Sequence, residues 1–178
     1  METREEKPVG NYLYRSAKLS AHYMAKAEAG RLGIPFINMI ISNVYGEGEV
    51  SNRFICSTLK KIINDEDIAF TSGEQMYDFI HIGDAVRAFY YVGEKGKAYC
   101  DYYIGSGEIK PLKQYIIDMY DTLDIKKKPG LGKIKYDGIS LNYDEFNRDS
   151  LKKELGFECN VSFMEGIKKT YKWLQETR

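Results

Sequence analysis

A short apolar run at residues 34–42, placed directly after a long helix-forming segment, most constrains the fold of this chain. The run is rich in Ile and Phe, and it is bounded by Gly33 on one side and by the turn-forming residues 45–48 on the other. A strand that is apolar on both faces is typical of a parallel sheet covered by helices. The chain is therefore predicted to be an α/β protein.

Helices and strands are predicted to alternate along the sequence. Apolar or small residues recur every three to five positions in residues 12–32, which predicts a helix that ends at Gly33. Further helices are expected at 51–64, 85–92, 111–123, 149–155 and 162–178, further strands at 76–82, 99–104 and near Ile134, and a short apolar segment at 68–70. Asp84 is expected to cap the helix at 85–92. This alternation favours a largely parallel sheet.

The composition excludes several classes of protein. Among 178 residues, 26 basic side chains balance 26 acidic ones, so no basic surface for nucleic acid is expected. The longest apolar run is far shorter than the roughly 20 residues that span a bilayer, and the N-terminal residues are charged, so we expect neither a membrane protein nor an exported one. Three widely spaced cysteines and two histidines support neither disulfides nor a metal site, which favours reduced thiols in a cytoplasmic protein.

Tyr14 and Lys18 form the candidate catalytic pair. They are four residues apart in the helix at 12–32, so both side chains lie on one face. A phenol is a poor proton donor at neutral pH, but an adjacent ammonium stabilises its phenolate and allows proton exchange with a substrate hydroxyl or carbonyl. Chance alone predicts about 1.6 such pairs in this composition, and Tyr91 with Lys95 is a second one. The alternative is two solvated residues on a helix face.

Four sequence blocks are informative as a set. In chain order they read NYLYRSAK, SNVYGEG, GEQMYDFIHIGD and LGF followed by GIKKTYKW. In that order and spacing, the chain resembles the C-terminal half or more of the extended short-chain dehydrogenase/reductase family, the NAD(P)-dependent nucleotide-sugar epimerases, dehydratases and reductases. The resemblance covers nearly the whole chain. It implies the C-terminal part of a Rossmann-like parallel sheet plus a small α/β substrate-binding domain.

The resemblance also implies a division of the chain. Residues 1–42 would be a remnant of the dinucleotide-binding domain, with the catalytic helix and the strand after it. Residues 43–178 would be mainly the substrate-binding domain, and residues 77–104 would return in part to the Rossmann-like sheet. Tyr14 would be the catalytic acid/base, and Lys18 would bind the nicotinamide ribose while tuning the phenol.

Further binding residues follow from the same resemblance. Ser42 would lie at the nicotinamide end of the cofactor, and Asn43 would donate to the diphosphate of the sugar nucleotide without adding charge. The other substrate-binding residues would be Arg53, Phe70 and Tyr77, with Phe70 near the nucleobase. The alternatives are a turn that ends a strand at Ser42 and Asn43, and a plain core position for Phe70.

The sequence departs from the family pattern in two ways. None of its 16 glycines forms the Gly-x-Gly-x-x-Gly turn that binds a dinucleotide, so the main binding segment for NAD or NADP is expected to be absent and the isolated chain inactive. Tyr77 stands where many relatives have an Arg that faces the nucleotide phosphate. Lys133, Lys135 or Arg53 would then supply a positive charge for the phosphate, without the pair of parallel hydrogen bonds that the missing Arg would make.

Two functions remain open from the sequence. The first is the C-terminal part of an NAD(P)-dependent enzyme that modifies a nucleotide sugar by hydride transfer. The second is a non-catalytic module for dimerisation or substrate binding, either truncated or acting with a separate Rossmann chain. A homodimer through the helix 11–32 is expected. We expect His81 to be a structural residue rather than a catalytic one, and the loop at 105–107 to be a tight turn rather than a phosphate-binding loop.

Overall fold

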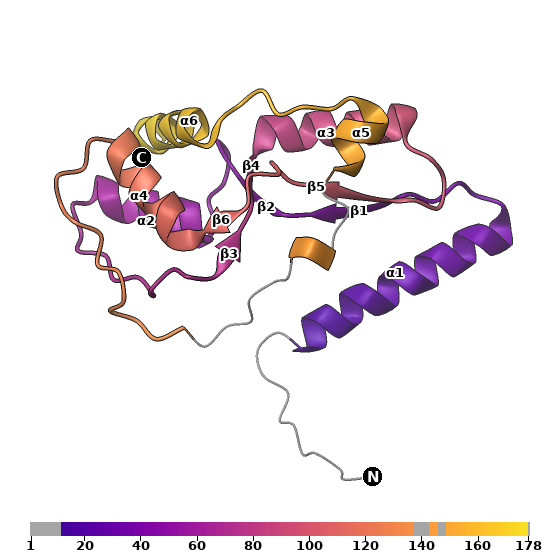
Figure 1. Ribbon diagram of the computed structural model, residues 1–178, viewed down its shortest axis with the longest axis horizontal. Coiled ribbons are helices and arrows are strands. Elements are labelled where there is room, and N and C mark those ends of the chain that lie inside the picture. The colour runs from indigo at the N-terminus through magenta and orange to yellow at the C-terminus, as the bar shows by residue number, and fades with distance from the viewer. Residues whose placement is uncertain (1–11, 137–142, 146–148, 178) are drawn as a thin grey trace, which may run out of the picture.

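The computed structural model describes residues 12–136, 143–145 and 149–177, in which helices alternate with short strands (Figure 1). The elements in chain order are α1 (Tyr12–Leu32), β1 (Asn38–Ile41), β2 (Asn43–Tyr45), α2 (Phe54–Ile63), β3 (Met76–Tyr77), β4 (Phe79–His81), α3 (Ile82–Lys95), β5 (Asp101–Ile104), β6 (Lys110–Pro111), α4 (Leu112–Thr122), the 3-10 helix η1 (Tyr143–Glu145), α5 (Ser150–Leu155) and α6 (Phe163–Glu176).

The strands form three pairs. β1 pairs with β5 in parallel, from Asn38 opposite Asp101 to Ile41 opposite Ile104. β2 pairs with β4 in parallel, with Asn43 opposite Phe79, whereas β3 and β6 are antiparallel. Helices lie between the parallel partners along the chain, as crossover connections require. The predicted α/β class with a largely parallel sheet is therefore confirmed.

The apolar run predicted as one strand is divided in two. β1 ends at Ile41, after which the chain leaves its partner β5 and pairs with β4 through β2. Ser42 lies at this change of partner, and its amide still donates to the carbonyl of Ile104 at 2.9 Å. The sequence pattern does not show the division, because both halves are apolar and differ in partner rather than in composition.

Two other predictions are corrected. The N-cap of α3 is His81, whose Nδ1 accepts from the amide of Gly83 at 3.2 Å, so the prediction of Asp84 as the cap is wrong. The short apolar segment at 68–70 forms an isolated bridge, between Ala69 and Gly130. No strand includes Ile134 within the part of the chain that the structure describes.

Two apolar clusters hold the elements together. One lies between α2, α4, α6 and β4 and contains most of the buried aromatic side chains, including Phe79, Tyr115 and Phe163. The other lies between α3, α5, β4 and β5 and includes Ile80 and Tyr102. Phe79 and Ile80 point to opposite faces of β4, as alternation along a strand requires. This short strand therefore joins the two clusters.

Helix α1 lies apart from both clusters (Figure 1). Ala29 is the one residue of the helix that is buried. Large side chains such as Leu13, Tyr23 and Met24 are exposed along its length. Helices of water-soluble folds normally bury an apolar stripe, so α1 presents surface that the described residues do not cover.

Two glycines in helices are expected to respond in opposite ways to substitution by Ala. A Cβ at Gly166 in α6 would lie 2.2 Å from the Tyr45 hydroxyl, which is itself held by the carbonyl of Phe163 at 3.1 Å. A Cβ at Gly93 in α3 meets nothing within 4 Å. In urea unfolding, Gly166→Ala should lower the free energy of unfolding by about 1–3 kcal/mol, and Gly93→Ala should raise it by roughly 0.5–1 kcal/mol. Equal shifts in the same direction would contradict this packing.

Candidate active site

The Tyr14–Lys18 pair lies on one face of α1. The Lys18 ammonium is 5.6 Å from the centre of the Tyr14 ring, and Tyr14 is 63% exposed. Both groups are therefore open to a ligand that approaches this face of the helix. The Tyr14 phenol and the Lys18 ammonium are close together, as predicted. The described residues do not enclose the pair in a pocket.

Ser42 and Asn43 lie where β1 ends and β2 begins. The Asn43 side-chain amide donates to the carbonyl of Asp78 at 3.1 Å, and its backbone amide donates to the same oxygen at 3.2 Å. The Ser42 hydroxyl is buried and makes no hydrogen bond of regular geometry with the described residues. No hydrogen bond or ion pair between described residues joins this pair to Tyr14 or Lys18.

Asp78 is the most buried acidic group near these residues, with 0% of its surface exposed. One carboxylate oxygen accepts from the Ser106 amide at 3.0 Å and the Ser106 hydroxyl at 2.6 Å. The other accepts from the Tyr103 hydroxyl at 3.0 Å and the Gly107 amide at 3.2 Å. The backbone amides of the 105–107 loop are thus used by an internal carboxylate, which supports the structural role predicted for this loop.

Two tyrosines surround the junction at Ser42. Burial raises the pKa of Tyr103, and the charge of Asp78 raises it further, whereas the nearby Ser42 side chain acts in the opposite direction. The Tyr143 ring packs edge-on against that of Tyr103, with 6.5 Å between centroids. Burial also raises the pKa of Tyr143, whose hydroxyl lies near the Asn43 side chain. Both phenols are thus held in the neutral form, as hydrogen-bonding groups rather than as bases.

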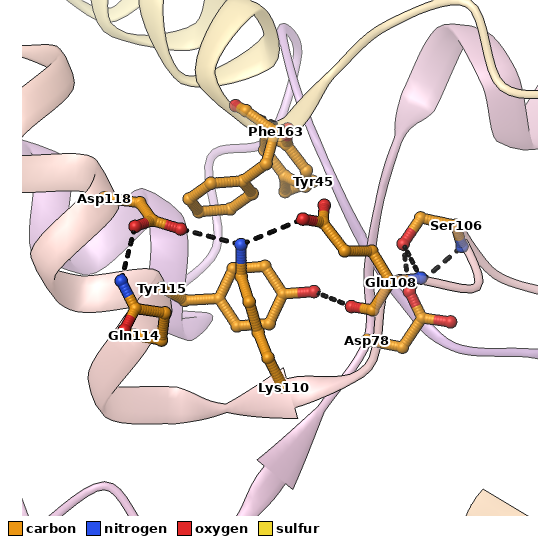
Figure 2. A network of polar contacts seen from close by, with 9 residues as sticks. All are labelled: Tyr45, Asp78, Ser106, Glu108, Lys110, Gln114, Tyr115, Asp118 and Phe163. Carbon is orange, nitrogen blue, oxygen red and sulfur yellow. Dashed lines mark hydrogen bonds and ion pairs between the residues drawn. The ribbon is translucent and has the colours of Figure 1, made fainter.

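A polar network continues from the 105–107 loop towards α4 (Figure 2). The Glu108 amide donates to the Ser106 hydroxyl at 3.0 Å, and the Tyr115 hydroxyl donates to the Glu108 carbonyl. The Lys110 ammonium lies 2.7 Å from Asp118 and 3.2 Å from Glu108, above the Tyr115 ring. Because two carboxylates already neutralise it, Lys110 is not a free cation for a substrate phosphate.

The remaining predicted substrate-binding residues differ in how far they are buried. Phe70 is 5% exposed and packs against Phe54 and Tyr120, which favours the alternative of a core position. Tyr77 is half-buried and stacks on Phe79 at 5.4 Å, and burial raises its pKa. Arg53 is exposed at the N-terminus of α2 and forms no ion pair with the described residues.

The two candidate lysines lie on one segment beside Phe70. The Phe70 amide donates to the Gly130 carbonyl at 2.9 Å, and the Ile134 amide donates to the Phe70 carbonyl at 3.0 Å. Lys133 and Lys135 are exposed on this segment, and neither forms an ion pair within the described ranges. Both ammonium groups therefore remain available to an anion.

Sequence reasoning missed the cluster of Asp78, Tyr103 and Tyr143. These residues are far apart along the chain, and each is unremarkable within its own element. The sequence shows only that Gly105 follows a buried strand, as a turn glycine would, whereas in the structure a Cβ there would lie 2.2 Å from the Asp78 carboxylate. A glycine forced by a side chain, rather than by a turn, marks a close approach that a sequence pattern does not reveal.

Cys159 lines a cavity of about 300 Å³ beside the 105–107 loop. Burial, with the charges of Asp84 and Asp78, raises the pKa of this thiol to about 12. Because only the thiolate reacts, we expect iodoacetamide to modify Cys159 at pH 8 roughly 1,000-fold more slowly than a free cysteine of ordinary pKa. The rate should still rise about tenfold per pH unit up to pH 10. Mass spectrometry of the alkylated peptide measures it, and a rate equal to that of glutathione would contradict the burial.

Neither a metal centre nor a membrane span is found in the described part of the chain. Across residues 12–136, 143–145 and 149–177, the His, Cys, Asp and Glu side chains do not gather in groups of three or more that would hold a metal ion. Within the same ranges, no helix combines the length and apolar character needed to cross a bilayer.

Parallel strand pairs whose partners are connected through helices define an α/β protein. The chain belongs to the NAD dependent epimerase/dehydratase family, which it matches over residues 2–105. It is 30% identical over 142 residues to CDP-abequose synthase of Salmonella muenchen, a match that covers 75% of this chain and 46% of that protein. The chain thus spans about half the length of the curated relatives it matches.

Solved structures share the fold. That of dTDP-glucose 4,6-dehydratase from Bacillus anthracis in complex with NAD matches with a TM-score of 0.82 and 23% identity, over 98% of this chain and 56% of that one. That of UDP-glucose 4-epimerase from Thermotoga maritima with UDP-glucose matches with a TM-score of 0.78 and 24% identity, over 96% and 55%. The Rossmann-like fold predicted from the sequence is confirmed.

Proposed function

We propose that this chain is the C-terminal part of an NAD- or NADP-dependent enzyme that epimerises, dehydrates or reduces a nucleotide sugar. The Tyr14–Lys18 pair carries the proposal, because its ammonium lies beside an exposed phenol in a chain of an NAD-dependent family. The cofactor, when bound, exchanges a hydride with a carbon of the sugar. Tyr14 would exchange the proton of the sugar hydroxyl, and Lys18 would stabilise the phenolate and bind the nicotinamide ribose.

The residues present fit one end of a dinucleotide. Tyr14 and Lys18 are exposed, and the Ser42 hydroxyl has bonding capacity to spare, which suits a nicotinamide and its ribose. A pyrophosphate needs free backbone amides, but those of Ser106 and Gly107 are bound to Asp78. These two amides are therefore not available to a pyrophosphate, and the sequence has no Gly-x-Gly-x-x-Gly turn to supply others. We expect other polypeptide to hold the pyrophosphate and the chain alone to have no activity.

The nucleotide sugar would bind beside the junction of β1 and β2. One amide hydrogen of Asn43 is used by Asp78, and its second can donate to a diphosphate oxygen. Arg53, Tyr77, Lys133 and Lys135 are the further candidates for the nucleotide. In this proposal residues 1–42 belong to the dinucleotide-binding domain, and 43–178 belong mainly to the substrate-binding domain. The β1–β5 pair supports the return of residues 77–104 to the first domain.

A second candidate function is a non-catalytic module. The exposed apolar side chains of α1, among them Leu13, Leu19 and Met24, favour it. In this case α1 would form a homodimer or bind a separate Rossmann chain, and the protein would bind a nucleotide sugar without converting it. We place either form in the cytoplasm, in keeping with three free thiols in the described residues and with the cofactor and substrate proposed.

The test joins this chain to a dinucleotide-binding half, either encoded upstream of Met1 or taken from CDP-abequose synthase of Salmonella muenchen. We call the product the completed enzyme. It is incubated with NAD(H) or NADP(H) and with UDP-, dTDP-, GDP- and CDP-sugars, and the products are identified by mass spectrometry. The proposal expects conversion of at least one sugar by the completed enzyme and of none by the chain alone. Binding of NAD without any conversion would favour the module.

A further inference from the structure

Asp78 is a fully buried titratable group to which the proposed mechanism assigns no task. Its carboxylate accepts four hydrogen bonds, all from neutral donors, and it forms no ion pair with the described residues. A buried charge is costly unless its lone pairs are satisfied. Two of the donors are backbone amides, which can only donate, so both carboxylate oxygens are held in place as acceptors.

Asp78 joins two strand pairs at one point. Its carbonyl holds the backbone and the side chain of Asn43 at the start of β2. Its carboxylate holds Tyr103 on β5 and the loop that follows β5. At Ser42 the chain passes from β1, which pairs with β5, to β2, which pairs with β4. Asp78 therefore holds this junction from both of the neighbouring strands.

The packing around the carboxylate leaves little freedom. A Cβ at Gly105 would lie 2.2 Å from the Asp78 carboxylate and 2.3 Å from the Tyr103 ring. Ser106, which Asp78 binds, is linked through Glu108 to Tyr115 and hence to α4 (Figure 2). The carboxylate is therefore tightly held, and movement of Asp78 would affect Asn43 directly and Ser42 through Tyr103.

We propose that Asp78 is a positioning residue that acts through Tyr103 and through its own carbonyl to fix Ser42 and Asn43 for cofactor and substrate. Tyr103 is the connecting group, because its hydroxyl donates to Asp78 and lies beside the Ser42 side chain. The roles of Ser42 and Asn43 in binding rest on the proposed function. The hydrogen bonds that hold these two residues in place are independent of it.

Tyr103→Phe tests the connection without removing the buried charge. It deletes the hydroxyl and keeps the ring packed against Tyr143. Tyr102→Phe is the matched control, since Tyr102 is the adjacent residue of β5, is also buried, and uses its hydroxyl to accept from the Lys97 amide at 3.0 Å on the other face. Each variant thus loses one buried hydroxyl from the same strand.

The first readout is hydrogen exchange of the chain. Tyr103→Phe should raise the exchange rates of the Ser42 and Asn43 amides about tenfold and leave that of Lys97 unchanged, whereas Tyr102→Phe should do the reverse. Equal exchange of Ser42 and Asn43 in the two variants would overturn the proposal. This readout needs no cofactor or substrate, so it decides the positioning role even if the completed enzyme proves inactive and the proposed function fails.

The second readout is the kinetics of the completed enzyme. Tyr103→Phe should lower kcat about tenfold through misplacement of the reacting groups, at a melting temperature close to that of Tyr102→Phe, which should keep its kcat. A loss of kcat that simply follows the melting temperature in both variants would show a structural role only and would overturn the proposal, as would an unchanged kcat in an active enzyme.

Discussion

Tyr14→Phe is expected to lower kcat of the completed enzyme by about 10²–10⁴-fold. The substitution removes the proton that the proposed mechanism moves and keeps the ring and its contact with Lys18. The KM for the nucleotide sugar should change little, because the contacts proposed for its diphosphate and nucleobase are made by other residues. Steady-state kinetics at saturating NAD measures both constants.

The second Tyr–Lys pair of the chain provides the control. Lys95 lies 4.7 Å from the centre of the Tyr91 ring on α3, so the spacing and the contact resemble those of Tyr14 and Lys18. The Tyr91 ring packs against Phe157 in the second apolar cluster, away from the proposed cofactor. Tyr91→Phe should leave kcat within about twofold of the wild type. If both variants lost activity to the same degree, the assignment to Tyr14 would be wrong.

Asp84→Asn is expected to lower the free energy of unfolding by about 3 kcal/mol. The Asp84 carboxylate is 1% exposed and accepts from the amides of Asn160 and Val161 at 2.8–3.1 Å, and from Arg87 at 2.6 Å. An amide in its place presents N–H groups to donors and leaves at least one buried donor unpaired. Urea unfolding followed by circular dichroism measures the change.

The loss of stability in Asp84→Asn should be greatest where α3 contacts the segment that precedes α6. Limited proteolysis should cut residues 156–162 faster in Asp84→Asn than in the wild type, because this segment would lose its anchor. Asp124→Asn is the control, since Asp124 is 82% exposed and pairs with Lys126 at the surface, and it should shift stability by less than about 0.5 kcal/mol. Equal denaturation midpoints for the two variants would contradict the anchoring role.

The parts predicted well from the sequence are those encoded locally. The helix expected at 162–178 is α6, and Ser162 opens it with a capping box that includes Glu165. The helix expected at 12–32 is α1, with Gly33 in the left-handed conformation after it. Periodicity, caps and C-terminal glycines act within a few residues, so one sequence is enough to reveal them.

The parts predicted poorly depend on partners far along the chain. The division of the apolar run at Ser42 arises because its two halves pair with different strands that lie far along the chain. Ile41 at the end of β1 is opposite Ile104 on β5, whereas Asn43 at the start of β2 is opposite Phe79 on β4. His81 caps α3 in place of Asp84, because the Asp84 carboxylate accepts hydrogen bonds from the amides of Asn160 and Val161 instead. Tertiary contacts of this kind override local preference.

The candidate site shows the same limit. Tyr14 and Lys18 could be paired from sequence because one helical turn brings them together, and the contact is present. Asp78 could not be placed beside Tyr103 and Ser106, because the strand pairing that joins them is not visible in a single sequence. The roles of Tyr14, Lys18, Ser42 and Asn43 stay predictions that the variants above test.

Rapid mixing of the completed enzyme with NAD(P) and its nucleotide sugar tests the central claim most directly, with the absorbance of the reduced nicotinamide as the signal. If this chain supplies the proton-transfer side of the reaction, the signal should change rapidly in the wild type and in Tyr91→Phe, and the change should be slowed at least about 10²-fold in Tyr14→Phe. A change of equal rate in the wild type and in Tyr14→Phe would contradict the account.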